Sequence, residues 1–184
     1  MKRFVAVMMM CLGFFSGSHA RDFEATGSDY GYAFSDVPGW IGIGQDLETF
    51  PQADMVFYAA ERNGGKVHIR YAYTDVYIYT NVTSGQPEEL SRLLEEGYRE
   101  ESPNLKVVRA KDIGIGDDHH AKVTYYLNVT SENKAQVVAS IPGKRVFVSL
   151  VMTANSEKLL RENLPDFEKL LLTYREREVG SGEQ

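Results

Sequence analysis

The sequence predicts an α+β fold, in which a single mostly antiparallel sheet carries helices packed on it. Four strand-like runs follow one another between Leu105 and Thr153, and the segments that join them are too short for the crossover that parallel strands need. Two amphipathic segments flank these runs, one after Ser84 and one after Asn155. A content of 43% hydrophobic and 25% charged residues is that of an ordinary globular chain.

The first twenty residues have the layout of a cleavable export signal. A basic start precedes the apolar run 4–15, which is shorter than the roughly 20 residues that span a bilayer. Small residues at Ser18 and Ala20 fit cleavage after Ala20. We therefore expect residues 1–20 to be a signal peptide and the protein to be secreted or periplasmic, with no stable membrane span after cleavage.

Removing the signal changes what the composition implies. It takes away Lys2, Arg3 and Cys11, so the remaining 164 residues carry 18 basic and 26 acidic side chains, a formal charge of −8 in place of −6. Because phosphate binding needs clustered basic residues, we expect no nucleic-acid partner. Cys11 is the one cysteine of the sequence, so the exported chain is expected to have no disulfide and no thiol nucleophile. Asn81 and Asn128 match the glycosylation acceptor pattern, which has meaning only in a host that glycosylates such proteins.

The folded domain is expected to span residues 21–178, and its polar lead-in ends in a short strand. Segment 37–40 is predicted to turn, because its Pro-Gly pair favours a tight reversal. The glycine-rich segment 39–44 has no following helix, as a phosphate loop would need, so it too is predicted to be a turn. Residues 53–60 are apolar and precede the Asn-Gly-Gly of 63–65, which predicts a buried strand and a hairpin.

Residues 66–82 alternate strictly and form the most strand-like segment of the chain. Their number exceeds that of a usual strand, so we expect a bend or bulge near Asp75. One face of this segment carries Tyr71, Tyr73, Tyr77 and Tyr79. These tyrosines either line a groove for a ligand, with apolar rings and hydroxyls at the edge, or form a core face packed under a helix.

A helix is expected to begin near Pro87, where two acidic residues suit the helix dipole, and to end at Ser102. Its apolar stripe is Leu90, Leu93, Leu94 and Tyr98. An antiparallel meander should follow, in the runs 105–113, 121–129, 135–141 and 144–153.

The last helix is expected to begin at an Asn155 or Ser156 cap and to continue to Glu178. Pro165 predicts a kink or two short helices, because a proline inside a helix costs about 3 kcal/mol. Residues 179–184 are expected to be a flexible tail.

This order of elements resembles the PsbP-like superfamily, which includes the photosystem II protein PsbP, bacterial DcrB-like proteins and the Mog-type Ran-binding protein. The resemblance depends on the turn at 37–40, the helix PEELSRLLEEGY, the meander and the closing LPDFEKLLLTY. It covers residues 30–176 and implies a PsbP-like fold with a non-enzymatic accessory or binding role. No binding or catalytic motif of the family matches this sequence, so the resemblance assigns no functional residue.

The best candidate for a metal site is the run Asp117, Asp118, His119 and His120. Carboxylates and imidazoles are ligands of first-row metals. Adjacent residues of an extended chain point to opposite sides, however, so one ion would reach only two of the four. A solvated acidic turn explains the same residues. No cofactor motif occurs, and no cofactor is predicted.

These observations favour an exported, non-catalytic binding or accessory protein of the cell envelope. No hydrolase, nucleotide or dinucleotide motif is present, so the sequence predicts that the protein is not an enzyme. The expected partner is an unknown envelope protein or small ligand. The alternative is a periplasmic module that binds a small molecule or a metal through the Asp117–His120 loop or the tyrosine face.

Overall fold

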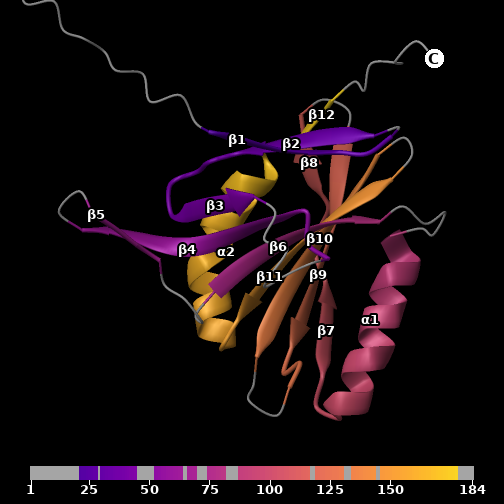
Figure 1. Ribbon diagram of the computed structural model, residues 1–184. Coiled ribbons are helices and arrows are strands. Elements are labelled where there is room, and N and C mark those ends of the chain that lie inside the picture. Colours follow the sequence, from indigo (N-terminus) through magenta and orange to yellow (C-terminus); the bar gives the residue numbers. More distant parts are fainter. Residues whose placement is uncertain are drawn as a thin grey trace, which may run out of the picture.

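A large antiparallel sheet forms the centre of the structure, which is a computed structural model (Figure 1). Its strands are β3 (Trp40–Gly44), β4 (Met55–Asn63), β5 (Lys66–Ile69), β6 (Thr74–Asn81), β7 (Lys106–Arg109), β8 (Ile113–Ile115), β9 (His119–Leu127), β10 (Ala135–Pro142) and β11 (Phe147–Ala154). They are ordered β3-β4-β6-β11-β10-β9-β7, with β5 paired to β4 and β8 paired to β9. The described pairings are all antiparallel. The predicted meander and the α+β fold class are therefore confirmed.

The structure describes residues 21–28, 30–44, 52–63, 66–69, 74–81, 87–116, 119–130, 134–143 and 146–177. The predicted signal peptide and the predicted tail lie outside these residues, so both stay predictions.

Two helices lie on opposite faces of the large sheet. They are α1 (Pro87–Glu101) and α2 (Glu157–Leu171). On β10, Val137 belongs to the core cluster that contains Leu160 of α2, whereas its neighbour Val138 packs with Leu94 of α1. Because successive strand residues point to opposite sides, the sheet separates the two helices. The main core is on the α2 side.

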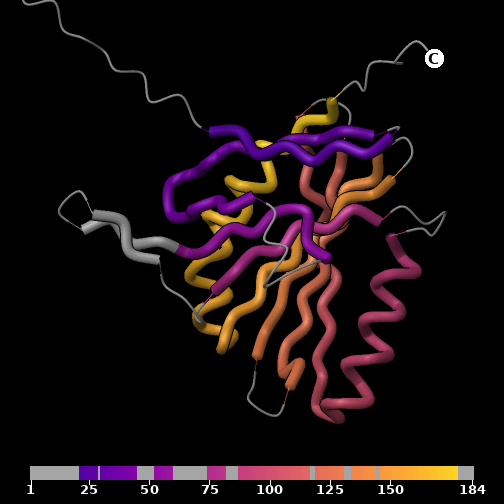
Figure 2. The backbone as a smooth tube through the Cα atoms, in the orientation of Figure 1, coloured from indigo at the N-terminus to yellow at the C-terminus, as the bar shows by residue number. Residues whose placement is uncertain are grey.

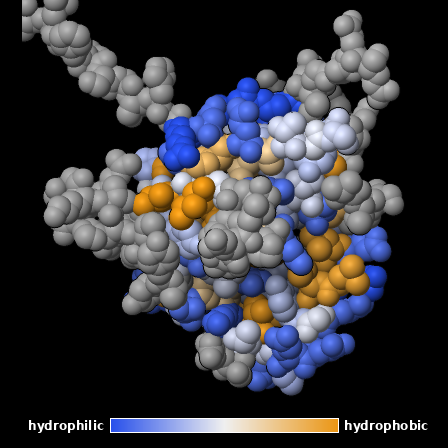
Figure 3. Space-filling model, viewed as in Figure 1, coloured by the Kyte–Doolittle hydropathy of each residue, from blue (hydrophilic) through white to orange (hydrophobic). Residues whose placement is uncertain are grey.

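The predicted apolar stripe of α1 is only partly buried. Leu94 and Tyr98 pack against the sheet, but the side chain of Leu93 is 53% exposed. Apolar surface is visible at α1 in Figure 3. The helix therefore adheres to the sheet through a narrower contact than the sequence predicts.

The proline in α2 does not divide the helix in two. Ser156 caps the helix as predicted, its Oγ accepting a hydrogen bond from the Leu159 N–H at 3.2 Å. The helix then runs without interruption through Pro165 to Leu171. The fully buried side chains of Phe167 and Leu170 hold the second half against the sheet, which offsets the cost of the proline.

A second, three-stranded sheet joins the two ends of the described chain. It consists of β1 (Asp22–Thr26), β2 (Gly31–Ser35) and β12 (Arg175–Glu176), with β2 in the middle. Figure 2 shows the indigo N-terminal strands beside the yellow C-terminal strand. The prediction of helix to Glu178 is wrong: after Leu171 the Thr173 hydroxyl donates to the Leu170 carbonyl and accepts from the Ser35 N–H, which directs the chain into β12.

Two strand predictions also need correction. Segment 39–44, predicted to turn, is the edge strand β3, and a Cβ on Gly42 would lie 2.4 Å from the Phe23 ring. The glycine thus lets an aromatic ring of β1 pack on a strand. Segment 66–82 is divided into β5 and β6, because Ala60 pairs with Ile69 while Tyr58 pairs with Asp75. Residues 70–73, between the two strands, lie outside the described residues, and Asp75 itself lies within β6.

We expect Asp22→Asn to lower the melting temperature at pH 7. Asp22 accepts hydrogen bonds from the Ser35 hydroxyl and from Arg175, and these lower its pKa. Because the pKa of Asp22 is lower in the folded state, its ionised form stabilises the fold at a pH above the unfolded-state pKa. That stabilisation is lost as the pH falls through the folded-state pKa. Melting curves of the two proteins should therefore converge at low pH. A difference that persists unchanged at pH 2 would contradict this role of the charge.

Candidate functional site

The tyrosine face lies on the side of the sheet away from the main core. Val76 and Ile78 of β6 are fully buried in that core, so Tyr77 and Tyr79 between and after them point to the other side. Both are half-buried and pack with Val56 and with the other small-cluster residues Ala53 and Tyr58. Tyr71 and Tyr73 lie outside the described residues, so a ligand groove formed by all four stays a prediction.

A carboxylate stands on the same face. The Tyr77 hydroxyl donates to Asp75 Oδ2 at 3.3 Å. Asp75 lies directly opposite Tyr58 of the neighbouring strand β4. Asp75 Oδ1 is buried and has no hydrogen-bond partner among the described residues. Burial raises the pKa of Asp75, and the Tyr77 hydrogen bond offsets part of that rise. Burial, followed by the charge of Asp75, raises the pKa of Tyr77.

We expect Asp75→Asn to raise the melting temperature at pH 7. A carboxyl whose folded-state pKa lies above its unfolded value favours the folded protein only when protonated, so its ionisation destabilises the fold as the pH rises. Asparagine avoids the buried charge and keeps an acceptor for Tyr77. The gain should disappear below pH 3, where the carboxyl is protonated in both states. A lower melting temperature for the variant at pH 7 would show that the charge is stabilising.

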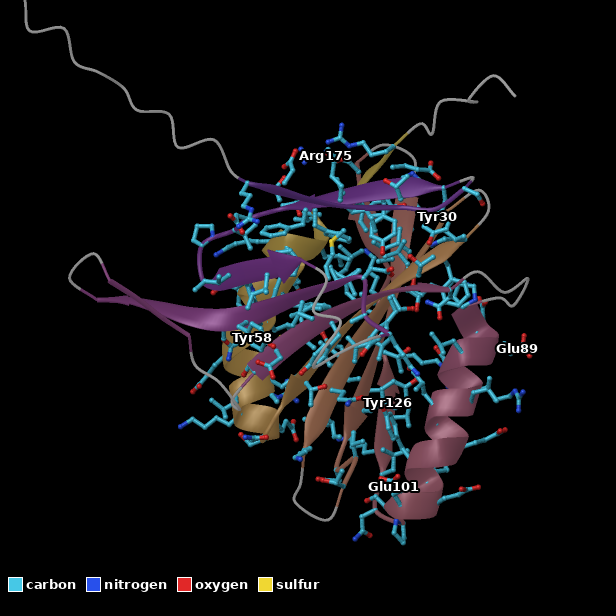
Figure 4. The ribbon with its side chains drawn as sticks, in the orientation of Figure 1. Tyr30, Tyr58, Glu89, Glu101, Tyr126 and Arg175 are labelled. Carbon is cyan, nitrogen blue, oxygen red and sulfur yellow. The ribbon has the colours of Figure 1, made fainter. Side chains whose placement is uncertain are left out.

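On the same side of the sheet as the tyrosine face, hydrogen bonds connect β9 and β10 to α1. Gln136 of β10 donates to the Thr153 hydroxyl at 3.1 Å and accepts from the Tyr98 hydroxyl. The Tyr126 hydroxyl donates to the Ser91 carbonyl at 3.1 Å, and Figure 4 shows Tyr126 between the sheet and α1. Burial raises the pKa of Tyr98 to about 12. These phenols are therefore neutral at physiological pH, and they fix the position of α1.

The predicted metal run is only partly described. Asp117 and Asp118 lie outside the described residues, and His119 and His120 open β9. His119 Nδ1 is 3.3 Å from the Pro142 carbonyl, and its Nε2 is 3.7 Å from Glu176. His120 is exposed beside Gly114. In the part of the chain that the structure describes, no three His, Cys, Asp or Glu side chains gather in a way that could hold a metal, so the metal site stays a prediction.

A groove that the sequence does not reveal lies on the α2 side of the large sheet. Helix α2 lies mainly against β2, β6, β10 and β11, and at β7, the last strand of the sheet, Val108 stays exposed. The resulting cavity has a volume of about 330 Å³. Its lining consists of Lys106, Val108, Tyr125, Leu127, Glu157, Leu160, Arg161 and Leu164. We call it the β7 groove.

The β7 groove has an apolar floor and a charged rim. Val108 is a large apolar residue that stays 39% exposed at this place. Arg161 on the rim is held by Glu157, with Nε to Oε1 at 2.9 Å. Burial raises the pKa of Tyr125 in the wall. The sequence contains one signal of this site: Lys106 and Arg109 bracket two valines in a short strand, the pattern of an edge strand.

Among the described residues, no helix combines the length and the apolar character needed to cross a membrane. No family model and no curated protein sequence matches the chain.

Solved structures do match it. The solution structure of cyanobacterial PsbP (CyanoP) from Synechocystis is 13% identical, with a TM-score of 0.51 over 89% of this chain and 98% of that one. The Ran-binding protein Mog1p of Saccharomyces cerevisiae is 9% identical, with a TM-score of 0.46 over 85% and 96%. Protein PA94 of Pseudomonas aeruginosa is 15% identical, with a TM-score of 0.47 over 80% and 92%. The match to cyanobacterial PsbP confirms that this chain has the PsbP-like fold.

Proposed function

We propose that this chain is an exported, non-catalytic binding protein of the cell envelope and that it binds its partner at the β7 groove. The observation that carries the proposal is the exposure of Val108 on the floor of an apolar groove beside an edge strand. Apolar surface rimmed by charge is typical of an interaction site. Export is supported by the basic, apolar and small-residue segments at residues 1–20.

The chemistry of the groove suits recognition. It combines apolar side chains from two strands and a helix with charges on its rim. Its volume of about 330 Å³ lies at the lower end of the range of ligand pockets, which suits a few side chains of a partner. An accessory role is also what the family resemblance implies.

The proposal can be tested with a photo-crosslinking amino acid placed at single positions in the host cell. At Val108 it should give an adduct with a defined envelope protein. Leu172 is a matched control, because it is an exposed leucine, 55% accessible, at the other end of α2. The same adduct at both positions, or none at Val108, would contradict binding at the groove.

Export is tested in the same cells. Cell fractionation should place the protein in the envelope or medium, and its mass should correspond to a chain that begins at Arg21. A cytoplasmic protein that retains residues 1–20 would contradict export.

A further inference from the structure

Strand β7 has an outer edge that no strand pairs with in the part of the chain the structure describes. The Ala110 N–H donates to the Val123 carbonyl at 2.9 Å, and the register continues this pairing at Val108 and Lys106. In an antiparallel pair, the residues between such hydrogen-bonded positions turn their N–H and C=O groups outward. The backbone groups of Val107 and Arg109 therefore point away from the sheet and can accept another strand.

The charges of β7 discourage a second copy of the same chain. If two copies of β7 paired antiparallel about the centre of the strand, Lys106 would face Arg109 at both ends. Like charges directly opposite one another destabilise a strand pair. No ion pair neutralises Lys106 among the described side chains, and Arg99 and Arg109 share one acidic partner, Glu95. The edge is thus cationic at both ends in an otherwise acidic protein.

The β7 groove adjoins this edge on the α2 side. Lys106 and Val108 share that side, whereas Val107 and Arg109 lie on the α1 side. An added strand would direct one side chain beside Val108, where the partly buried Leu164 of α2 also offers apolar contact.

Resting on the proposed function, we propose that β7 binds an extended segment of a partner protein as an added antiparallel strand, with two apolar residues between two acidic ones. The register specifies this order. The residues opposite Arg109 and Lys106 are acidic, and those opposite Val108 and Val107 are apolar. The main-chain hydrogen bonds supply affinity, and the groove and the charges select the sequence.

The probe is a capped, fluorescent peptide, Thr-Thr-Glu-Leu-Val-Glu-Thr-Thr, titrated with the purified chain from Arg21 onward and followed by anisotropy. A peptide with lysine at both Glu positions is the control. Exchange of two favourable charge pairs for unfavourable ones should weaken binding at least roughly fivefold, with the difference reduced at high salt. Equal binding of the two peptides would overturn the proposed charge recognition.

Two variants test the geometry. Val107→Pro removes an outward N–H without touching the pairs with β9, and the peptide should bind roughly tenfold more weakly or not at all. Lys106→Glu should reverse part of the preference between the two peptides. The melting temperature of each variant shows whether it folds. Lys106 is exposed, so Lys106→Glu should fold even if Val107→Pro does not, and it then tests the proposal alone.

The outcomes separate this inference from the proposed function. If the cellular adduct at Val108 forms equally in wild type and in folded Val107→Pro, and the peptide does not bind, strand addition is wrong while binding at the groove stands. If the peptide binds with the expected variant effects but no cellular adduct forms at Val108, strand addition stands and the envelope function is wrong.

Discussion

Replacing Phe167 with alanine is expected to lower the free energy of unfolding by about 3–5 kcal/mol. Phe167 is completely buried, and it packs in the main core with Leu160, Leu170 and residues of the sheet. Removing a buried ring forfeits its transfer free energy and leaves a cavity that the sheet cannot fill, because close-packed strands relax only partly.

The measurement is denaturant unfolding at pH 7, followed by circular dichroism and tryptophan fluorescence from Trp40. Leu172→Ala is the matched control, because Leu172 follows the same helix and its side chain is 55% exposed. The control should change the free energy of unfolding by less than roughly 0.5 kcal/mol. A loss below about 1 kcal/mol for Phe167→Ala would contradict the packing of α2 against the sheet.

The residue pattern predicts the elements that depend on local periodicity. Leu159, Leu160, Phe167 and Leu170 recur at helical spacing, and they are the side chains by which α2 meets the core. The meander is predictable for a similar reason, since short connections allow only antiparallel neighbours. The N-cap of α2 at Ser156 is also a local signal, and it is confirmed by the hydrogen bond from Leu159.

The features that the sequence does not predict depend on partners far away in the chain. Arg175 is a strand residue because it pairs with β2 and donates a hydrogen bond to Asp22, and both partners lie more than 100 residues earlier in the chain. Gly42 lies in a strand because β3 pairs with β4, and the Phe23 ring occupies the space where a Cβ would be. The β7 groove forms where α2, which lies mainly against β6, β10 and β11, leaves Val108 of β7 exposed, and no local pattern encodes where a helix lies across a sheet.

One carboxylate accepts hydrogen bonds from both the small and the large sheet. Asp54 Oδ2 accepts hydrogen bonds from the Tyr32 hydroxyl at 2.9 Å and from the Thr80 N–H at 2.6 Å. Tyr32 comes from β2 and is almost completely buried, while Thr80 belongs to β6. Burial raises the pKa of Tyr32, so its hydroxyl stays a donor at physiological pH. Asp54 therefore connects the sheet of the chain termini to the central sheet.

Replacing Asp54 with alanine should lower the free energy of unfolding by about 2–3 kcal/mol. The partly buried Thr80 N–H loses its acceptor, and the Tyr32 hydroxyl keeps only the Thr80 side chain as a partner. Asp54→Asn is the matched control: its amide oxygen can accept both hydrogen bonds at the position of Oδ2, so this variant should lose only about 1 kcal/mol of unfolding free energy, through loss of the charge.

A double-mutant cycle with Tyr32→Phe, measured by denaturant unfolding, isolates the hydrogen bond between the two sheets. A coupling of at least about 0.5 kcal/mol is expected, since a partner inside a shared hydrogen-bond network does not act independently. Additive effects of the two substitutions would mean that the carboxylate serves Thr80 alone and that the small sheet is held by packing.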